Sequence, residues 1–155
     1  QGHVFDARDV LMGKVELKSP AVILGAGYVG METADFLLAK GIEVAVLEMQ
    51  ATPPVANYTA HGYWLHRRIR KSGGRLFFGA TVKAVDPGEV LYSQKDVDAK
   101  VPCAMVITAM GARPDNALEK ELADLGITFR TVGDAKSPRR LLEAIHEGHK
   151  AGREI

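Results

Sequence analysis

A glycine-rich turn between two short apolar segments constrains the fold of this chain more than any other feature. The apolar run at residues 21–24 leads directly into residues 25–30, which have the pattern G-x-G-x-x-G. Residues 29–40 follow a helical pattern, and a second apolar run occupies residues 44–47. Continuous apolar runs are typical of strands that are covered on both faces. A strand, a helix and a strand in this order predict a βαβ unit whose two strands lie parallel.

Each glycine of this pattern has its own physical reason if a dinucleotide binds here. Gly25 allows the tight strand-to-helix turn, Gly27 leaves room for a pyrophosphate, and Gly30 lets the helix pack closely on the strand. Tyr28 and Val29 open the helix, whose unpaired N–H groups and positive dipole end favour phosphates. These five residues are therefore expected to bind the cofactor. The alternative is a glycine-rich turn that binds no ligand.

Glu48 follows the second apolar run and indicates which dinucleotide is bound. A carboxylate at this place accepts hydrogen bonds from the adenosine ribose hydroxyls and repels a 2′-phosphate. Residues 49–52 come next and include no cation that could hold such a phosphate. The sequence therefore favours NADH over NADPH.

The remaining patterns predict an α/β fold throughout the chain. We expect a Rossmann-like three-layer nucleotide-binding domain that contains a parallel sheet and a small antiparallel meander. The turn signal at residues 86–88, Asp-Pro-Gly, lies inside that meander. Strands are expected at residues 75–78, 81–85, 89–92, 97–101, 105–109 and 127–132, and helices at 6–12, 58–71, 118–125 and 138–152.

Composition and charge argue against several classes of protein. With 46% hydrophobic and 25% charged residues among 155, the chain is neither disordered nor fibrous. The net charge of +1 gives no reason to expect nucleic acid, and no apolar run reaches the roughly 20 residues that span a bilayer. Cys103 is the only cysteine, which excludes an internal disulfide, a C-x-x-C pair and a thiolate-rich metal cluster. We expect a cytoplasmic protein without a metal site, a membrane segment or a catalytic nucleophile.

Four segments, in the right order, resemble one group of flavoproteins. Residues 22–32 resemble the pyridine-nucleotide domain of flavoprotein reductases with two dinucleotide folds, and residues 108–114 resemble its second signature. Residues 133–148 begin with Gly-Asp-Ala, which is similar to the motif that holds the ribityl chain of FAD. Together with residues 6–11 and 13–14, they narrow the resemblance to the NADH:flavin oxidoreductases of the Old Yellow Enzyme superfamily. That group includes 2,4-dienoyl-CoA reductase, 2-enoate reductase and trimethylamine dehydrogenase.

The resemblance implies a pyridine-nucleotide-binding domain that positions NADH for hydride transfer to FAD. Residues 1–20 would be a linker from a missing FAD domain, and residues 21–130 the NAD(H)-binding domain. Residues 131–155 would be a strand and a helix that belong to the FAD domain of the parent enzyme. FMN, an iron–sulfur cluster and a (β/α)₈ barrel are expected only in missing domains of the parent. By itself, the chain is therefore expected to be inactive.

The resemblance also assigns three further cofactor-binding residues. Glu32 would lie near the nicotinamide carboxamide, Gly111 would let the backbone approach the nucleotide, and Asp134 would bind FAD in the parent enzyme. Simpler interpretations remain open for each of them. They are a solvated glutamate that favours the helix dipole, an ordinary turn before Pro114, and an acid in the cap region of the last helix.

Two other functions also remain open. One is a structural module that binds ADP or another nucleotide without redox turnover. Glu32 favours NADH binding over this alternative. The other is the NAD domain of a disulfide reductase, which the absence of a C-x-x-C pair disfavours.

Overall fold

The chain divides into two units after Gly111. The computed structural model describes residues 2–154, so residues 1 and 155, at the outer ends of the expected linker and C-terminal segment, lie outside the described residues. The first unit ends at Gly111 and the second begins at Ala112. The glycine motif, the strands beside it and the meander all belong to the first unit.

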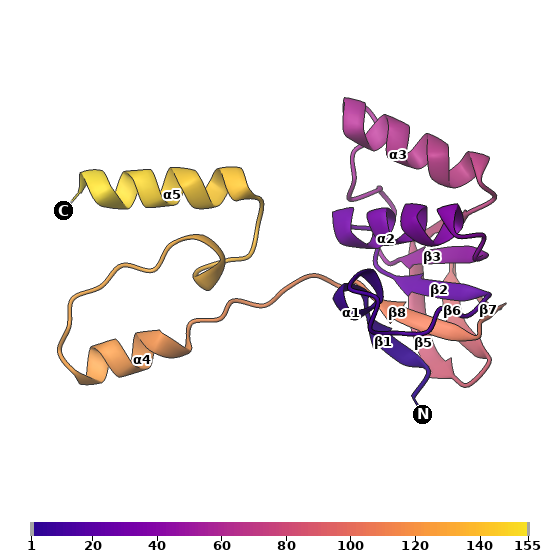
Figure 1. The fold of residues 1–155 in the computed structure, drawn as a ribbon, viewed down its shortest axis with the longest axis horizontal. Helices are drawn as coiled ribbons and strands as arrows, with labels where there is room; N and C mark the ends of the chain where they lie inside the picture. Colours follow the sequence, from indigo (N-terminus) through magenta and orange to yellow (C-terminus); the bar gives the residue numbers. More distant parts are fainter. Residues whose placement is uncertain (1, 155) are drawn as a thin grey trace. The chain divides into compact units, whose positions relative to one another are not determined.

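A five-stranded parallel sheet forms the centre of the first unit (Figure 1). Its strands are β1 (Val4–Asp6), β2 (Ala21–Leu24), β3 (Val44–Glu48), β4 (Arg75–Phe78) and β8 (Met105–Thr108). The strand order is β1-β8-β2-β3-β4. Val22 of β2 lies opposite Ala45 of β3 and Val106 of β8. The two strands that flank the glycine motif are therefore parallel neighbours, as predicted.

Helices cover one face of this sheet. They are α1 (Ala7–Leu11), α2 (Tyr28–Ala39) and α3 (Ala60–Lys71). Ile23 and Val46 of the sheet belong to a buried cluster on this face. Leu37 of α2 and Leu65 of α3 pack in the same cluster.

A small antiparallel sheet covers the other face. It is formed by β5 (Ala80–Asp86), β6 (Glu89–Gln94) and β7 (Val97–Pro102). Val22 and Leu47 of the parallel sheet pack with Val90 and Val101 in a second buried cluster. Because successive side chains of a strand point to opposite faces, β2 and β3 need apolar residues on both faces. The expected α/β architecture of three layers, with a parallel sheet and an antiparallel meander, is confirmed.

The first strand is not predictable from the sequence. Val4–Asp6 carries one half-buried side chain between two exposed ones, so no pattern marks it as a strand. Pairing with β8, with Val4 opposite Val106, makes it one. The helix that follows begins close to its predicted place, since Asp6 caps it by accepting the N–H of Arg8 at 2.8 Å. The interval 1–20, expected as a linker, therefore contributes β1 and α1 to the first unit.

The second unit contains α4 (Ala117–Asp124), a 3₁₀ turn η1 (Gly133–Ala135) and α5 (Leu141–Arg153). The strand expected at residues 127–132 is wrong, because no described residue of the second unit forms a strand that could pair with it. The expected C-terminal strand and helix are instead η1 and α5. That last helix begins after Pro138, with Arg140 as its N-cap. The N–H of Arg140 donates to the Glu143 carboxylate at 3.1 Å.

Candidate functional site

The glycine motif forms a tight turn at the carboxyl end of β2. Gly25 has a φ of +104°, a backbone conformation that favours glycine. A Cβ on Gly25 would also lie 2.5 Å from the carbonyl oxygen of Ala109. The N–H of Gly25 donates to the carbonyl of Leu47 at 2.8 Å, which ties the turn to β3. Both the backbone angle and the close contact therefore require a residue without a side chain.

The other two glycines of the motif differ in their surroundings. A Cβ on Gly30 would lie well within 3.0 Å of the Gly25 carbonyl oxygen, closer than real Cβ atoms approach. Gly27 is the N-cap of α2 with a φ of −66°, and nothing lies within 4 Å of a Cβ built on it. Gly30 therefore lets α2 approach the turn. Gly27 faces open space at the helix end, where unpaired N–H groups and the positive end of the dipole lie.

Glu48, the predicted ribose acceptor, also holds the glycine turn in place. Its side chain is buried, with 7% of the residue exposed. Oε2 accepts the N–H of Ala26 at 2.8 Å, and Oε1 accepts the N–H of Gln50 at 2.8 Å. A carboxylate offers about four acceptor positions, so these two hydrogen bonds leave acceptor positions on both oxygens. The sequence does not reveal the contact with Ala26, because it depends on β2 and β3 ending side by side.

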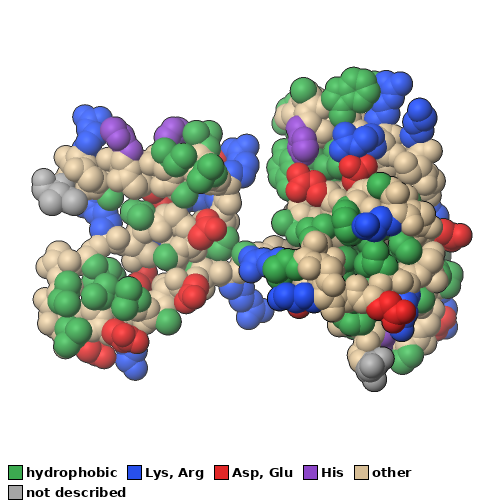
Figure 2. Space-filling view, in the orientation of Figure 1, with side chains coloured by type: hydrophobic (Ala, Val, Ile, Leu, Met, Phe, Trp, Pro, Cys, Tyr) green, Lys and Arg blue, Asp and Glu red, His purple; other side chains and the backbone are tan. Residues whose placement is uncertain are grey.

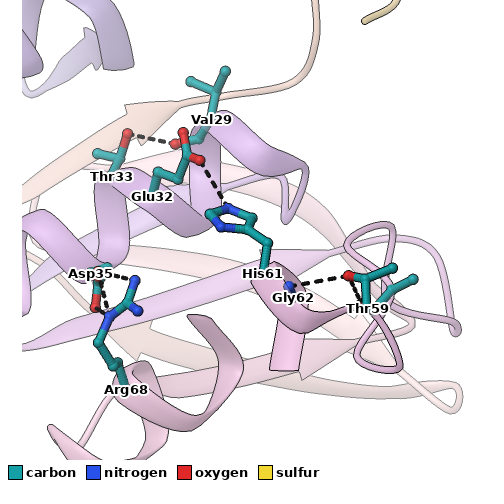
Figure 3. Close-up of polar contacts among 9 residues, drawn as sticks. Val29, Glu32, Thr33, Asp35, Thr59, His61, Gly62 and Arg68 are labelled. Carbon is teal, nitrogen blue, oxygen red and sulfur yellow. Dashed lines mark hydrogen bonds and ion pairs between the residues drawn. The ribbon is translucent and has the colours of Figure 1, made fainter. Parts of the chain in front are cut away.

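Three further predicted residues lie near the start of α2. Tyr28 and Val29 are partly exposed on its first turn. Glu32 lies beyond that turn, so it does not face the positive end of the helix as a first-turn acid would. Its Oε1 lies 3.2 Å from Nε2 of His61 on α3. The two side chains point toward each other (Figure 3). The sequence gives no signal for His61, because nothing in it shows which residues of α3 face α2.

The segment after β8 passes beside the glycine turn. The N–H of Ala109 donates to the carbonyl of Leu24 at 2.8 Å, and the carbonyl oxygen of Ala109 lies against Gly25. Gly111 has a φ of +91°, and a Cβ there would meet nothing within 4 Å. Its backbone angle, rather than a close contact within the chain, therefore favours glycine at this position. The fold thus brings the start of the second signature against the glycine motif.

Asp134 belongs to the second unit, where it lies in η1. Its Oδ1 accepts the N–H of Arg139 at 3.4 Å, but the N-cap of α5 is Arg140. Asp134 therefore holds the segment in front of the last helix and does not cap the helix itself. The N–H of Gly133 donates to Glu147 of α5 at 2.8 Å. A hydrogen bond from Arg139 lowers the pKa of that Glu147 carboxyl group.

The described residues give little support to other kinds of site. Within residues 2–154, no group of three or more His, Cys, Asp and Glu side chains could hold a metal ion. No helix in the same range has both the length and the apolar character needed to cross a membrane. Cys103 is buried, and this burial raises the pKa of its thiol. A protonated, buried thiol is a poor nucleophile.

The glycine turn and Glu48 offer groups that suit two different parts of a ligand. The start of α2 beside Gly27 favours an anion such as a phosphate, because N–H donors and a positive dipole end meet there. The Glu48 carboxylate suits hydroxyl groups, which donate hydrogen bonds to it. Both groups lie at the carboxyl ends of parallel strands, where α/β sheets bind their ligands. The site therefore suits a phosphate ester that carries a nearby diol.

Comparison with known proteins agrees with this geometry. Residues 4–135 match the family described as pyridine nucleotide-disulphide oxidoreductase. A cinnamate reductase from Clostridium sporogenes is 45% identical over 158 residues, which cover 98% of this chain and 23% of the relative. An NADH oxidase from Thermoanaerobacter brockii is 30% identical over 156 residues, which cover 98% of this chain and 24% of the relative.

A solved structure gives the same picture. The structure of a 2-naphthoyl-CoA reductase matches with a TM-score of 0.83 and 27% identity, over 98% of this chain and 23% of that one. The chain spans about a quarter of the length of these relatives. The similarities confirm the resemblance to NADH:flavin oxidoreductases of the Old Yellow Enzyme superfamily.

Replacement of Gly30 by alanine should destabilise the first unit, whereas Gly27→Ala should do so only slightly. The new Cβ at position 30 must displace the Gly25 carbonyl or α2, which should cost about 3 kcal/mol or more. At position 27 the Cβ enters open space, so only the weaker capping of alanine counts, at less than about 1 kcal/mol. Urea unfolding followed by circular dichroism measures both. Equal stability of the two variants would contradict the geometry described for the turn.

Proposed function

The chain belongs to the pyridine nucleotide-disulphide oxidoreductase family, and we propose that it is the NAD(H)-binding part of a flavin-dependent oxidoreductase. When bound, the nicotinamide of NADH supplies a hydride, which FAD accepts. The chain's own residues bind and orient the nucleotide. One observation carries the proposal: the open space beside Gly27, at the start of α2 and next to the turn that Glu48 holds.

In this proposal, different residues of the site bind different parts of the nucleotide. The pyrophosphate lies beside Gly27 and accepts hydrogen bonds from the N–H groups at the start of α2. The adenosine ribose donates its hydroxyls to Glu48, whose carboxylate is already fixed by two backbone N–H groups. Tyr28, the first residue of α2, and Glu32, four residues later, meet the nicotinamide end. Holding the reacting groups in place in this way lowers the barrier to hydride transfer.

The second unit supports the proposed place of this chain in a larger enzyme. Figure 2 shows hydrophobic side chains on the surface of this unit. Leu118, Leu125, Ile127, Phe129, Leu141, Leu142 and Ile145 are each at least 40% exposed. Such a concentration of exposed apolar side chains marks a surface that another part of a protein covers. We assign residues 131–155 to an FAD domain, where Asp134 would bind FAD, and place FMN, the iron–sulfur cluster and the barrel in other parts of the parent enzyme.

A disulfide reductase is less well supported. Such an enzyme needs a reactive dithiol, whereas Cys103 is the only cysteine of this chain and is buried. The dithiol would have to lie outside these residues.

A single free cysteine also supports a reducing compartment, and we therefore place the protein in the cytoplasm.

Calorimetric titration with NADH tests the proposed function. Gly27→Val should weaken binding about 100-fold or more, because the branched side chain fills the space that the pyrophosphate needs. Gly148→Val is the matched control, since a Cβ at Gly148 of α5 also meets nothing within 4 Å and should leave NADH binding unchanged. A folded Gly27→Val variant that binds NADH like the unaltered chain would show that the motif is only a structural turn.

The chain should bind NADH at least about 10-fold more tightly than NADPH, because the Glu48 carboxylate repels the 2′-phosphate. Glu48 is a poor residue to replace, since its loss also removes the acceptor for Ala26 and Gln50. Met49 is 73% exposed directly after Glu48, so Met49→Arg adds a cation without disturbing the core. This variant should raise the affinity for NADPH about 5- to 10-fold and leave that for NADH nearly unchanged. Met49→Gln controls for side-chain length, and tighter binding of NADPH by the unaltered chain would refute the preference.

A further inference from the structure

His61 reaches from the start of α3 to two residues at the edge of the glycine turn. Its Nε2 lies 3.2 Å from Oε1 of Glu32 and donates to this carboxylate in the tautomer that carries the proton on Nε2. Its ring stacks on the ring of Tyr28, with 5.6 Å between the centroids and 30° between the planes. Tyr28 and Glu32 are four residues apart on α2, so they lie on one face of that helix. The His61 side chain therefore contacts both Tyr28 and Glu32 on this face of α2.

The backbone that carries His61 is held by contacts of its own. Thr59 is the N-cap of α3: its Oγ1 accepts the N–H of Gly62 at 3.1 Å and donates to the carbonyl of Ala56 at 2.9 Å (Figure 3). A Cβ on Gly62 would lie within 3.0 Å of that Ala56 carbonyl oxygen, so the loop closes on α3 only because residue 62 is glycine. These contacts therefore hold the backbone of His61 in place independently of the contacts that its side chain makes.

The alignment of α2 and α3 does not depend on His61. Two turns farther along, the Arg68 guanidinium donates to the Asp35 carboxylate through Nε and Nη2, at distances of 2.8–3.1 Å. Ile69 of α3 and Ala34 of α2 are also buried in the shared cluster. These contacts hold the two helices together.

The His61–Glu32 pair contributes little to stability. The two side chains are 56% and 52% exposed. Exposed ion pairs and hydrogen bonds of this kind have small effects on the free energy of unfolding. The pair instead restricts the rotation of the His61 and Glu32 side chains. Both side chains lie where the nucleotide is proposed to bind.

We propose that His61 is a positioning residue, which holds the Glu32 carboxylate and the Tyr28 ring in the orientation that receives the nicotinamide end of NADH. The inference rests on the proposed function. A glutamate side chain that is already held loses less rotational freedom when a ligand binds. His61 therefore improves the affinity for the nicotinamide end, while the pyrophosphate and adenosine sites at Gly27 and Glu48 do not depend on it.

Binding of NADH and of ADP-ribose, which lacks the nicotinamide, separates these parts of the nucleotide. For His61→Ala, calorimetry should give an NADH affinity about 3- to 10-fold lower and an ADP-ribose affinity changed by less than about 2-fold. His61→Leu keeps the bulk without the donor and provides the same comparison if the alanine variant does not fold. In Glu32→Ala, a further His61→Ala change should weaken NADH binding by less than about 2-fold, because the two residues act together.

Arg68→Ala is the matched control, since it removes a different polar link between α2 and α3. It should leave the ratio of NADH to ADP-ribose affinity unchanged. The proposal is overturned if this variant changes the ratio as much as His61→Ala, if His61→Ala weakens both ligands equally or neither, or if its effect persists fully without Glu32. If the unaltered chain binds neither ligand, the proposed function itself fails.

Discussion

The close approach of α2 to the end of β2 is the constraint on which the site depends. Because Gly30 has no side chain, its backbone reaches the carbonyl of Gly25, and the helix starts directly beside the turn. That position places the unpaired N–H groups of α2 above the carboxyl end of the sheet. It also sets where Glu32 meets α3. Because Gly30 has no Cβ, α2 can take this direction, and this direction determines which side chains surround the start of the helix.

The fold was predictable where burial leaves a pattern within one element. β2 and β3 are apolar at nearly every position because each has a helical layer on one face and the antiparallel sheet on the other. The short β1 has no such pattern, since pairing with β8 alone makes it a strand. Residues 127–132 show the opposite case. They have apolar residues typical of a strand, but no described strand of the second unit lies beside them to accept their hydrogen bonds.

Within the site, the local motif is readable and the contacts between elements are not. The three glycines and Glu48 stand in a fixed order along one βαβ unit, so their spacing predicts a nucleotide site. The hydrogen bond from Ala26 to Glu48 depends on two strands ending together. The contact between His61 and Glu32 depends on how α3 is rotated against α2, which side-chain packing over the whole interface decides. Single-sequence reasoning has no access to that rotation.

The strand end that supports the glycine turn is also the route by which the chain leaves the first unit. Ala109 is bonded to Leu24 and lies against Gly25, and two residues later Gly111 ends the unit. Ala109 also packs against the first buried cluster, which contains Ile107, so one residue joins the glycine turn, the core and the exit of the chain. The segment that joins the two units is thus held at its start by the same backbone that supports the glycine turn.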